Sequence, residues 1–378
     1  MPNRQLVPKE PISDWDHIEL IEAHSQKEKQ AIYRLRYQVQ VEEMGRMIPG
    51  ANHLRKTITD ELDDWSYLLY AEQNGRIVCT VRLTIGLAED FPNDLTQIFQ
   101  LKRFQEFAPS SPNLCLGTKL MVVSEFRSTP VMFRLMAMSY KIARNNNVQF
   151  SFGGCNPYLI PMYEQLGYRS FTAGFQDPGY GFVVPQVILL EDLQHLIALG
   201  SPFLRIARKY PNSSAAREWL QVNVPEVFAV PVSVVTDAQA KWGYVTRRVG
   251  NLSDIAPILQ RLTMEESRQF LQIAAPFECN KGQEFIRTGD VCNELNLLIA
   301  GEMKVSDDAG RSWLAGPGDA VGALGLFDQT HHKVDATAVS DCEILAISRF
   351  AFEKLLRSQP DLAEKLCFGS RQTGEGSV

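Results

Sequence analysis

Apolar positions between residues 17 and 175 follow two spacings, every second residue and every third or fourth residue. The segment HIELIEA, residues 17–23, shows the alternation of a half-buried strand. Apolar residues from Ile32 to Val39 then recur at helical spacing, with Ser25 as the expected N-cap and Gly45 as the expected stop. This part of the chain therefore predicts a strand followed by a helix.

The next apolar runs predict a hairpin and further alternation of strands and helices. Two runs meet at Asn74-Gly75, the strongest short-range signal for a tight hairpin. A strand NLCLGTKLMVV, a helix with Pro130 at its start and a strand VQFSFGG come next. A helix and a strand are then expected within residues 156–171. The mixture predicts an α+β domain over residues 1–175.

The pattern changes twice after residue 175. Residues 176–245 contain helical segments interrupted at Gly200-Ser201-Pro202, and we expect a helical extension and linker there. Residues 246–378 are dominated by short strands with Gly-rich turns, and a helical segment closes the chain. Such spacing predicts a small β-barrel or jelly roll as a second domain.

Composition narrows the class of protein. The 378 residues carry a formal net charge of −6, which argues against a nucleic-acid partner. None of the seven cysteines forms a C-x-x-C pair, so we expect no metal site and no disulfide framework. Reduced thiols, no apolar signal core at the N-terminus and no run of about 18 apolar residues predict a cytoplasmic protein.

A cluster of charges near the hairpin is a candidate acceptor site. Asp60 and Asp63 precede the hairpin, Arg82 lies in its second strand and Arg36 lies on the first helix. The carboxylates can orient an ammonium group or accept its proton through water, and the arginines can bind a carboxylate with two hydrogen bonds. Alternatively, the arginines pair with the aspartates and hold a loop against the sheet. The two interpretations are compatible.

The stretch NPYLIPMYEQLGYRSF, with Asn156 seven residues before Tyr163, resembles the late signature of GNAT N-acyltransferases. The order of predicted elements is also that of the GNAT fold. The resemblance implies that Tyr163 lies near the thioester sulfur and protonates the departing thiolate, while Asn156 binds the pantetheine arm. The alternative is a core aromatic at Tyr163, with Gly167 only ending the helix.

The expected pyrophosphate loop departs from the GNAT pattern. In VVSEFRSTPVMF, Arg127 stands at the basic position, but Pro130 and Met132 replace the two glycines. Arg127 and a helix N-terminus could still hold the single phosphate of a phosphopantetheine arm. The resemblance also implies that the strand residues Met121, Val122 and Val123 bind the acyl donor.

A second resemblance is to acyl-homoserine-lactone synthases and long-chain N-acyl amino acid synthases. It is carried by RYQVQVEEMG, by the D-x-x-D pair and by the Arg-Leu that ends the hairpin. These GNAT-like enzymes take acyl groups from acyl carrier protein. Gln40 and Arg46 stand where lactone synthases carry aromatics of the S-adenosylmethionine pocket, which disfavours that acceptor. The resemblance covers residues 18–175 and implies acyl-phosphopantetheine as co-substrate, with no tightly bound cofactor.

Two surface segments suggest partners. Lys102 and Arg103 beside aromatics could dock an acidic carrier protein, although such pairs are more often a solvated face. An apolar run with Arg205, Arg208 and Lys209 could contact a membrane surface or cover an acyl chain. A packing helix between domains is the alternative for the second segment.

The second domain resembles cyclic nucleotide-binding domains in KGQEFIRTGD, GPGDAVGALGLF and the residues that follow. After Gly322, Ala323 occupies the family's Glu position. The family's Arg position falls at Val334, beside Lys333 and before Thr337. Without the arginine, a charge-assisted pair to a cyclic phosphate is lost, and lysine lacks its planar fork. We expect a degenerate sensor domain used for packing, for another ligand or for a homodimer contact.

These observations predict an N-acyltransferase that moves a medium or long acyl chain from acyl carrier protein, or acyl-CoA, to an amino acid or similar amine. Two alternatives remain open at this point. One is a CoA-dependent acetyltransferase regulated by the second domain. The other is a non-catalytic sensor or scaffold protein.

Overall fold

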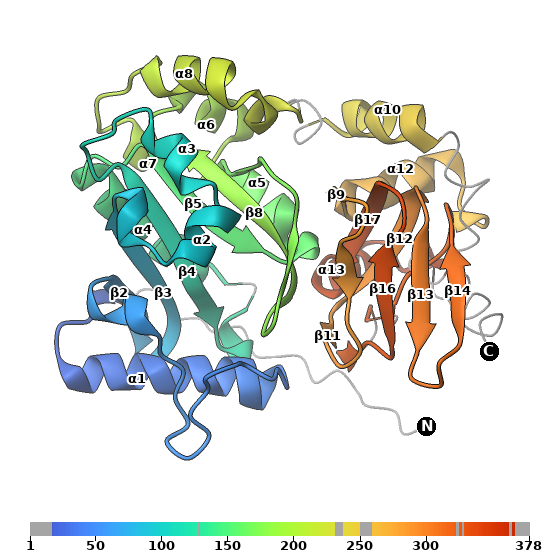
Figure 1. Ribbon diagram of the computed structural model, residues 1–378, viewed down its shortest axis with the longest axis horizontal. Helices are drawn as coiled ribbons and strands as arrows, with labels where there is room; N and C mark the ends of the chain where they lie inside the picture. The colour runs from blue at the N-terminus through green and yellow to red at the C-terminus, as the bar shows by residue number, and fades with distance from the viewer. Residues whose placement is uncertain are drawn as a thin grey trace.

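The computed structural model describes residues 17–127, 129–230, 237–249, 259–322, 325–326, 329–362 and 365–366. They form two domains that lie side by side, the N-terminal one built on a large mixed sheet and the C-terminal one on smaller sheets (Figure 1). The predicted α+β class is therefore confirmed.

The N-terminal domain contains a sheet of eight strands in the order β1-β2-β3-β4-β5-β8-β6, and β7 pairs with β8. Its strands are β1 Glu19–Glu22, β2 Tyr67–Gln73, β3 Arg76–Gly86, β4 Leu114–Val122, β5 Phe150–Cys155, β6 Arg169–Ser170, β7 Phe175–Asp177 and β8 Gly181–Leu189. All neighbouring pairs are antiparallel except β4 and β5, which are parallel.

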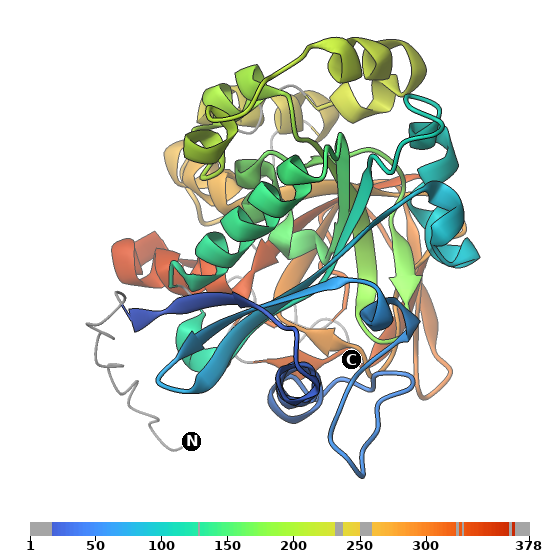
Figure 2. The ribbon, with the colours of Figure 1, turned by 90° about the vertical axis from the view of Figure 1, so that its left-hand side faces the viewer.

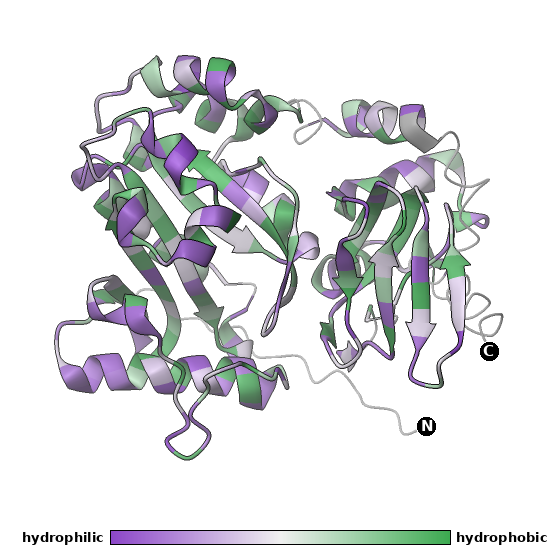
Figure 3. Cartoon of the chain, viewed as in Figure 1, coloured by the Kyte–Doolittle hydropathy of each residue, from purple (hydrophilic) through white to green (hydrophobic). Residues whose placement is uncertain are grey.

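Helices cover this sheet, and α4 packs against the strands β1 to β3 (Figure 2). The α-helices are α1 Gln26–Tyr37, α2 Asn93–Ile98, α3 Leu101–Gln105, α4 Val131–Asn145, α5 Ile160–Leu166, α6 Leu193–Leu199, α7 Leu204–Ala207 and α8 Ala215–Asn223. Shorter turns are η2 Gln38–Glu43, η3 Glu61–Asp64, η4 Ala88–Asp90, η5 Ser124–Phe126, η6 Pro157–Leu159 and η7 Pro225–Phe228. The inner strands are largely apolar, whereas α1 is polar along much of its length (Figure 3).

Local signals in the sequence explain how the first elements begin and end. Ser25 caps α1 in a capping box with Glu28, as its position predicts. The helix continues as the π-helix η2, and Gly45 follows with a φ of 68° that favours glycine. Asn74 and Gly75 both adopt positive φ, so β2 and β3 form the predicted tight hairpin.

The sheet continues beyond the expected boundary at residue 175, because β7 and β8 complete it. Sequence reasoning missed β8, whose apolar run is interrupted by Pro185. The proline is tolerated because it lies between the part of β8 that pairs with β7 and the part that pairs with β6. On the edge of β8 that pairs with β6 and β7, the missing N–H of Pro185 therefore interrupts no hydrogen-bonded ladder.

The C-terminal domain consists of short antiparallel strands and flanking helices, as expected for a jelly roll. Its sheets have the orders β10-β16-β13-β14, β11-β15 and β12-β17-β9. The elements are α10 Ala238–Val249, α12 Met264–Ile273, β9 Ala274–Cys279, β10 Glu284–Ile286, β11 Val291–Cys292, β12 Glu294–Ala300, β13 Met303–Asp307, β14 Ser312–Ala315, β15 Thr330–His331, β16 Val334–Ala338, β17 Cys342–Ser348 and α13 Arg349–Ser358.

The two domains share an apolar interface. Phe182 of β8 packs its ring against Phe285 and Phe277, with ring centroids 5.2 and 6.0 Å apart. The turn η6 packs against β9 and β17. Hydrogen bonds cross the same boundary, including one from Gln283 Nε2 to the Gly174 carbonyl at 2.6 Å. The contacts of η6 with β9 and β17 join the segment immediately before α5 to the C-terminal domain.

Candidate active site

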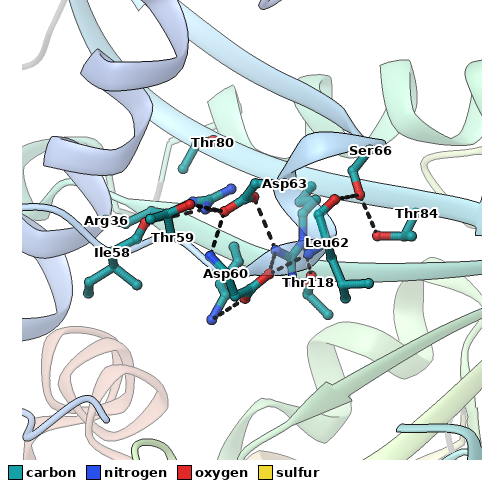
Figure 4. A network of polar contacts seen from close by, with 12 residues as sticks. Arg36, Ile58, Thr59, Asp60, Leu62, Asp63, Ser66, Thr80, Thr84 and Thr118 are labelled. Atoms are coloured by element: carbon teal, nitrogen blue, oxygen red, sulfur yellow. Dashed lines mark hydrogen bonds and ion pairs between the residues drawn. The ribbon is translucent and has the colours of Figure 1, made fainter. Parts of the chain in front are cut away.

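The charged residues expected at the acceptor site come together beneath the hairpin (Figure 4). Asp63 Oδ2 accepts a hydrogen bond from Arg36 Nη1 at 2.8 Å, and its Oδ1 accepts one from Arg82 Nη1 at 3.0 Å. Arg82 Nη1 also donates to Asp60 Oδ1. The interpretation in which the arginines hold the acidic loop against the sheet is therefore present in the structure.

The D-x-x-D spacing places both carboxylates at the start of one helical turn. Asp60 is the N-cap of η3, and its side chain accepts from the Leu62 N–H. Asp63 reaches back to accept from the Asp60 N–H at 3.0 Å. This reciprocal capping satisfies N–H groups that a short helix otherwise leaves unpaired. It also orients both acids toward the arginines.

Exposure separates these four residues into two groups. The side chains of Arg36, Asp63 and Arg82 are at most 2% exposed, whereas that of Asp60 is 38% exposed. Burial alone would raise the pKa of Asp63, but the hydrogen bond and charge of Arg36 outweigh it and lower the pKa to about 2. Asp60 is thus the member that a small molecule can reach, and the other three hold it in place.

Lys119 joins this cluster although sequence reasoning did not single it out. Its Nζ lies 3.5 Å from Asp60 Oδ2 and 5.5 Å from the centre of the Tyr180 ring. The residue has a φ of 56°, and the ladder between β3 and β4 shifts register beside it. The bulge turns the lysine toward the acid. A single bulged residue in a strand leaves no pattern in the sequence.

The strands β4 and β5 diverge next to this cluster. They pair only from Leu114 to Leu116 with Phe150 to Phe152. After that point β4 continues to Val122, paired with β3 on its other edge. Residues 121–123, expected at the acyl donor, lie on this part of the chain, where Met121 and Val123 are buried. Beyond Leu116 this edge of β4 has no β5 partner in the ladder, and such an edge is where an extended amide-containing arm can bond.

Tyr163 lines a cavity of about 30 Å³ that is enclosed mainly by apolar side chains of α4 and the sheet. The lining residues are Val81, Leu83, Gly117, Leu120, Met136, Ser139, Tyr140, Ala143, Ser151, Gly153, Tyr163, Tyr168, Ile188, Leu190 and Phe203. Burial raises the pKa of the Tyr163 hydroxyl well above its ordinary value, and the hydroxyl therefore keeps its proton. Gly167 ends α5 in the left-handed region, so the helix stop and the functional interpretation coexist.

Asn156, expected at the pantetheine arm, is held by the protein itself. Its amide donates to the carbonyls of Tyr180 and Phe182 at 2.7 and 2.9 Å. Its Oδ1 accepts from Arg46 Nη2 at 3.1 Å. These bonds fix the start of η6 and α5 relative to β8. The arrangement positions the helix that carries Tyr163.

Arg127 also has a partner within the chain. Its Nη2 donates to Glu43 Oε2 at 2.7 Å, and the same oxygen accepts from the Ser124 N–H at 3.2 Å. A carboxylate of η2 therefore occupies the donors that a GNAT loop would offer to an anion. Sequence reasoning missed Glu43 because it lies 84 positions from Arg127.

The two candidate partner surfaces have different environments. Arg103 binds Glu226 and the Asn223 carbonyl, and so packs against η7, whereas Lys102 is exposed. In the segment around α7, Phe203 is buried and stacks on Tyr140 with ring centroids 4.8 Å apart. Within the described residues no helix has the length and apolar character needed to cross a bilayer.

Three of the four residues expected at a cyclic-nucleotide-like pocket are described by the structure. A Cβ on Gly322 would lie 2.6 Å from His332 Nδ1, so the histidine fills the position beside this turn. Lys333 is exposed, and Thr337 pairs within β16. Ala323 lies outside the described residues.

The comparisons with known proteins match the two domains separately. Residues 31–189 match the family model of N-acyl amino acid synthase FeeM, and residues 276–359 match that of the cyclic nucleotide-binding domain. A cAMP-dependent protein kinase regulatory subunit from Eremothecium gossypii is 33% identical over 79 residues, 21% of this chain. The chain spans only 17% of the length of that relative.

Two solved structures resemble one domain each. The CoA-dependent acyl-homoserine lactone synthase BjaI, with SAM and isopentyl-CoA, is 16% identical with a TM-score of 0.39, covering 53% of this chain and 97% of that one. The Thermus thermophilus catabolite activator protein is 27% identical with a TM-score of 0.29, covering 32% of this chain and 60% of that one.

The family matches divide the chain into an N-terminal domain similar to N-acyl amino acid synthases and a C-terminal domain similar to cyclic nucleotide-binding domains, which confirms the two resemblances found in the sequence. The C-terminal domain also has a jelly-roll-like arrangement of strands.

Proposed function

We propose that this protein transfers a medium or long acyl chain from acyl carrier protein to the amine of an amino acid or a similar small amine. The observation that carries the proposal is the position of Tyr163, a protonated hydroxyl at an apolar cavity beside the divergence of β4 and β5. An acyl thioester needs these three features together, namely an apolar space for its chain, an open strand edge for its pantetheine amides, and a proton donor for its sulfur.

The reaction follows from these positions without a covalent enzyme intermediate. The amine nitrogen attacks the thioester carbonyl, the C–N bond forms, and the C–S bond breaks with its electron pair on sulfur. Tyr163 donates its proton to the thiolate, the proton lost by the amine passes to water, and water returns a proton to Tyr163. The products are an amide and a free thiol. Met121, Val122 and Val123 would hold the arm through backbone bonds.

The acyl chain would enter the cavity behind Tyr163. Its present volume of about 30 Å³ is roughly one water molecule's share, so the chain must displace lining side chains. Met136 and Leu120 are suited to this, because an unbranched or flexible apolar side chain repacks at low cost. Chain length would then be limited by how far α4 and α7 allow the lining to open.

The amine acceptor would approach Asp60. This carboxylate is the exposed member of the charged cluster and can attract an ammonium group. Lys119, 3.5 Å from it, can bind the carboxylate of an amino acid acceptor. We assign Arg36, Asp63 and Arg82 as positioning residues, because they are buried and hold Asp60 through Asp63 and η3.

Glu43 favours a carrier-protein thioester over acyl-CoA. Its carboxylate already bonds Arg127 and the Ser124 N–H, the donors that a CoA pyrophosphate would use. Binding CoA there would require two anions to share one site. A phosphopantetheine on a carrier protein brings one phosphate, held mainly by its protein, and Lys102 offers a cation to an acidic carrier surface.

The test uses the full-length protein with acyl carrier protein and CoA thioesters of several chain lengths and a panel of amino acids, with products read by mass spectrometry. We expect Tyr163→Phe to lower the rate about 100-fold without weakening thioester binding, since one proton donor is lost. Tyr168→Phe is the matched control, because this ring lies 5.3 Å from Tyr163 in the same cavity lining. Equal losses in both variants would contradict the role of Tyr163.

The same assay separates the alternatives. Product formed only from acetyl-CoA would support a CoA-dependent acetyltransferase. Absence of product from every thioester would support a sensor or scaffold protein. We further expect Glu43→Gln to lower KM for acyl-CoA and to leave KM for the carrier-protein thioester unchanged. Unchanged KM values for both donors would show that Glu43 does not exclude CoA.

A further inference from the structure

Three side chains with metal-binding atoms meet in the C-terminal domain, on the side that faces the acyltransferase domain. They are Cys292 at the end of β11, Glu294 at the start of β12, and His332 directly after β15. Their ligand atoms lie within 4.8 Å of one another, and His332 Nε2 is 3.9 Å from Glu294 Oε1. β11 and β15 pair with each other, which brings the cysteine and the histidine together from distant positions.

This cluster is buried. Cys292 is fully buried, and the side chains of His332 and Glu294 are 4% and 12% exposed.

A second observation at the same place indicates a polar binding site. Glu294 and His332 line a pocket together with Asn296, which is 1% exposed and whose Oδ1 has no hydrogen-bond partner among the described residues. Buried polar atoms without a partner are rare and call for a bound water or ion. The pocket is thus lined by this unpartnered acceptor and by two of the three metal-binding side chains, Glu294 and His332.

We propose that Cys292, Glu294 and His332 bind a divalent transition-metal ion of the Zn²⁺ class. Sulfur, imidazole nitrogen and carboxylate oxygen are the donors that Zn²⁺ uses in proteins. Ligands of a tetrahedral zinc ion stand about 3.3 to 3.8 Å apart, given metal–ligand distances of 2.0 to 2.3 Å. The observed separations, all within 4.8 Å, need to shrink by about 1.5 Å at most. On binding, the ion displaces the protons of the thiol and the carboxyl group.

The site goes beyond the proposed acyl transfer and is independent of it. Three protein ligands leave a fourth position, and the pocket beside Glu294 is lined across the domain boundary by Asn156, Tyr158 and Tyr180. These residues belong to, or contact, the turn η6 that precedes α5. Metal occupancy would therefore affect the junction between the domains, whatever reaction the first domain catalyses.

The experiment measures metal binding by the full chain. We expect protein stripped with a chelator to take up one Zn²⁺ per chain in competition with a chromophoric chelator. Replacement by Co²⁺ should give a thiolate-to-cobalt charge-transfer band and the intense visible bands of a tetrahedral ion. His332→Gln and Glu294→Gln should each weaken Zn²⁺ binding by about 100-fold or more, and Cys292→Ser should abolish the charge-transfer band.

Matched controls lie next to the cluster and elsewhere in the same domain. His331 is exposed and adjacent to His332, so His331→Gln should leave Zn²⁺ affinity unchanged. Cys342 is buried outside the cluster, so Cys342→Ser should retain the charge-transfer band. If the cluster variants fail to fold, the cobalt spectrum of the unaltered chain decides the question. A spectrum without a thiolate band, or equal loss of affinity in His331→Gln, would overturn the proposal.

Discussion

Asp60 and Asp63 belong to the same D-x-x-D pair in the sequence, but they have different roles in the charged cluster. Asp63 accepts from both arginines and is buried, whereas Asp60 shares Arg82 and remains partly exposed. Two buried arginines would be strongly unfavourable without this carboxylate. The buried members of the cluster thus hold Asp60 in place, and the stability of the cluster depends mainly on Asp63.

Replacing Asp63 should destabilise the protein far more than replacing its neighbour. Asp63→Asn leaves the buried Arg36 without its counter-charge, and we expect a loss of about 3 to 5 kcal/mol in the free energy of unfolding. Asp64→Asn is the control, because Asp64 is exposed and should change stability by no more than about 0.5 kcal/mol. Urea denaturation measures both, and similar values for the two variants would refute the assignment.

Glu164 predicts a pH dependence of stability. Burial raises the pKa of this carboxyl on α5 to about 7, and the Lys241 ammonium on α10 only partly offsets the shift. A raised carboxyl pKa means that the unfolded state ionises first, so stability falls as pH rises from about 4.5 to about 7. Glu164→Gln should flatten part of this decline, measured as unfolding midpoints across that range. Gln165→Ala, an exposed neighbour, should retain the full decline.

At the scale of elements, the pairing of β4 with β5 ends next to the cavity that we assign to a substrate. Glycines stand on both strands at this point, Gly117 just after the last pair and Gly153 opposite the Tyr163 ring. Neither has a positive φ, so their small size rather than backbone freedom is what the site uses. Side chains there would project into the cavity that we assign to the acyl chain.

Filling the cavity should shorten the preferred acyl chain. A Cβ at Gly153 would lie 3.6 Å from the Gly117 carbonyl oxygen and from the Tyr163 ring, which is ordinary contact, so Gly153→Ala should fold. We expect the longest accepted chain to lose about 10-fold in kcat/KM for each methylene that no longer fits, with short chains little affected. Gly316→Ala, where a Cβ meets open space, is the control. Uniform loss at every chain length would argue against this cavity.

At the scale of the whole molecule, the second domain packs on the first through aromatic rings and through the turn before α5. Phe182, Phe277 and Phe285 lie within one apolar cluster that extends through both domains. A ligand of the C-terminal domain would therefore act on η6 and α5 directly. We expect that cyclic nucleotides do not fill that role, because His332 rather than an arginine lies beside Gly322.

Cyclic AMP should leave the stability and activity of the protein unchanged. A ligand present at 100 times its Kd raises the free energy of unfolding by about 2.7 kcal/mol, a shift easily seen in thermal unfolding. We expect no such shift with cyclic AMP, because Lys333 is exposed and cannot replace the missing buried cation. A clear rise of the midpoint with cyclic AMP concentration would mean that the domain binds it in another way.

Local patterns determined much of this protein. The Ser25 cap and the Asn74-Gly75 turn are decided by residues a few positions apart, and the sequence predicted both. The D-x-x-D cap of η3 is equally local but was not predicted as a cap. The two family resemblances were likewise carried by contiguous motifs. Such features depend on backbone hydrogen bonds and φ preferences that neighbouring residues control.

Tertiary structure alone decided which side chains meet across the chain. Glu43 bonds Arg127, and Lys119 lies beside Asp60 at a bulge. β8 tolerates Pro185 because the residue lies between the segments that pair with β6 and with β7. The cluster of Cys292, Glu294 and His332 forms because β11 pairs with β15. The physical reason is common to all of them, since burial and pairing partners depend on long-range packing that no short window of sequence contains.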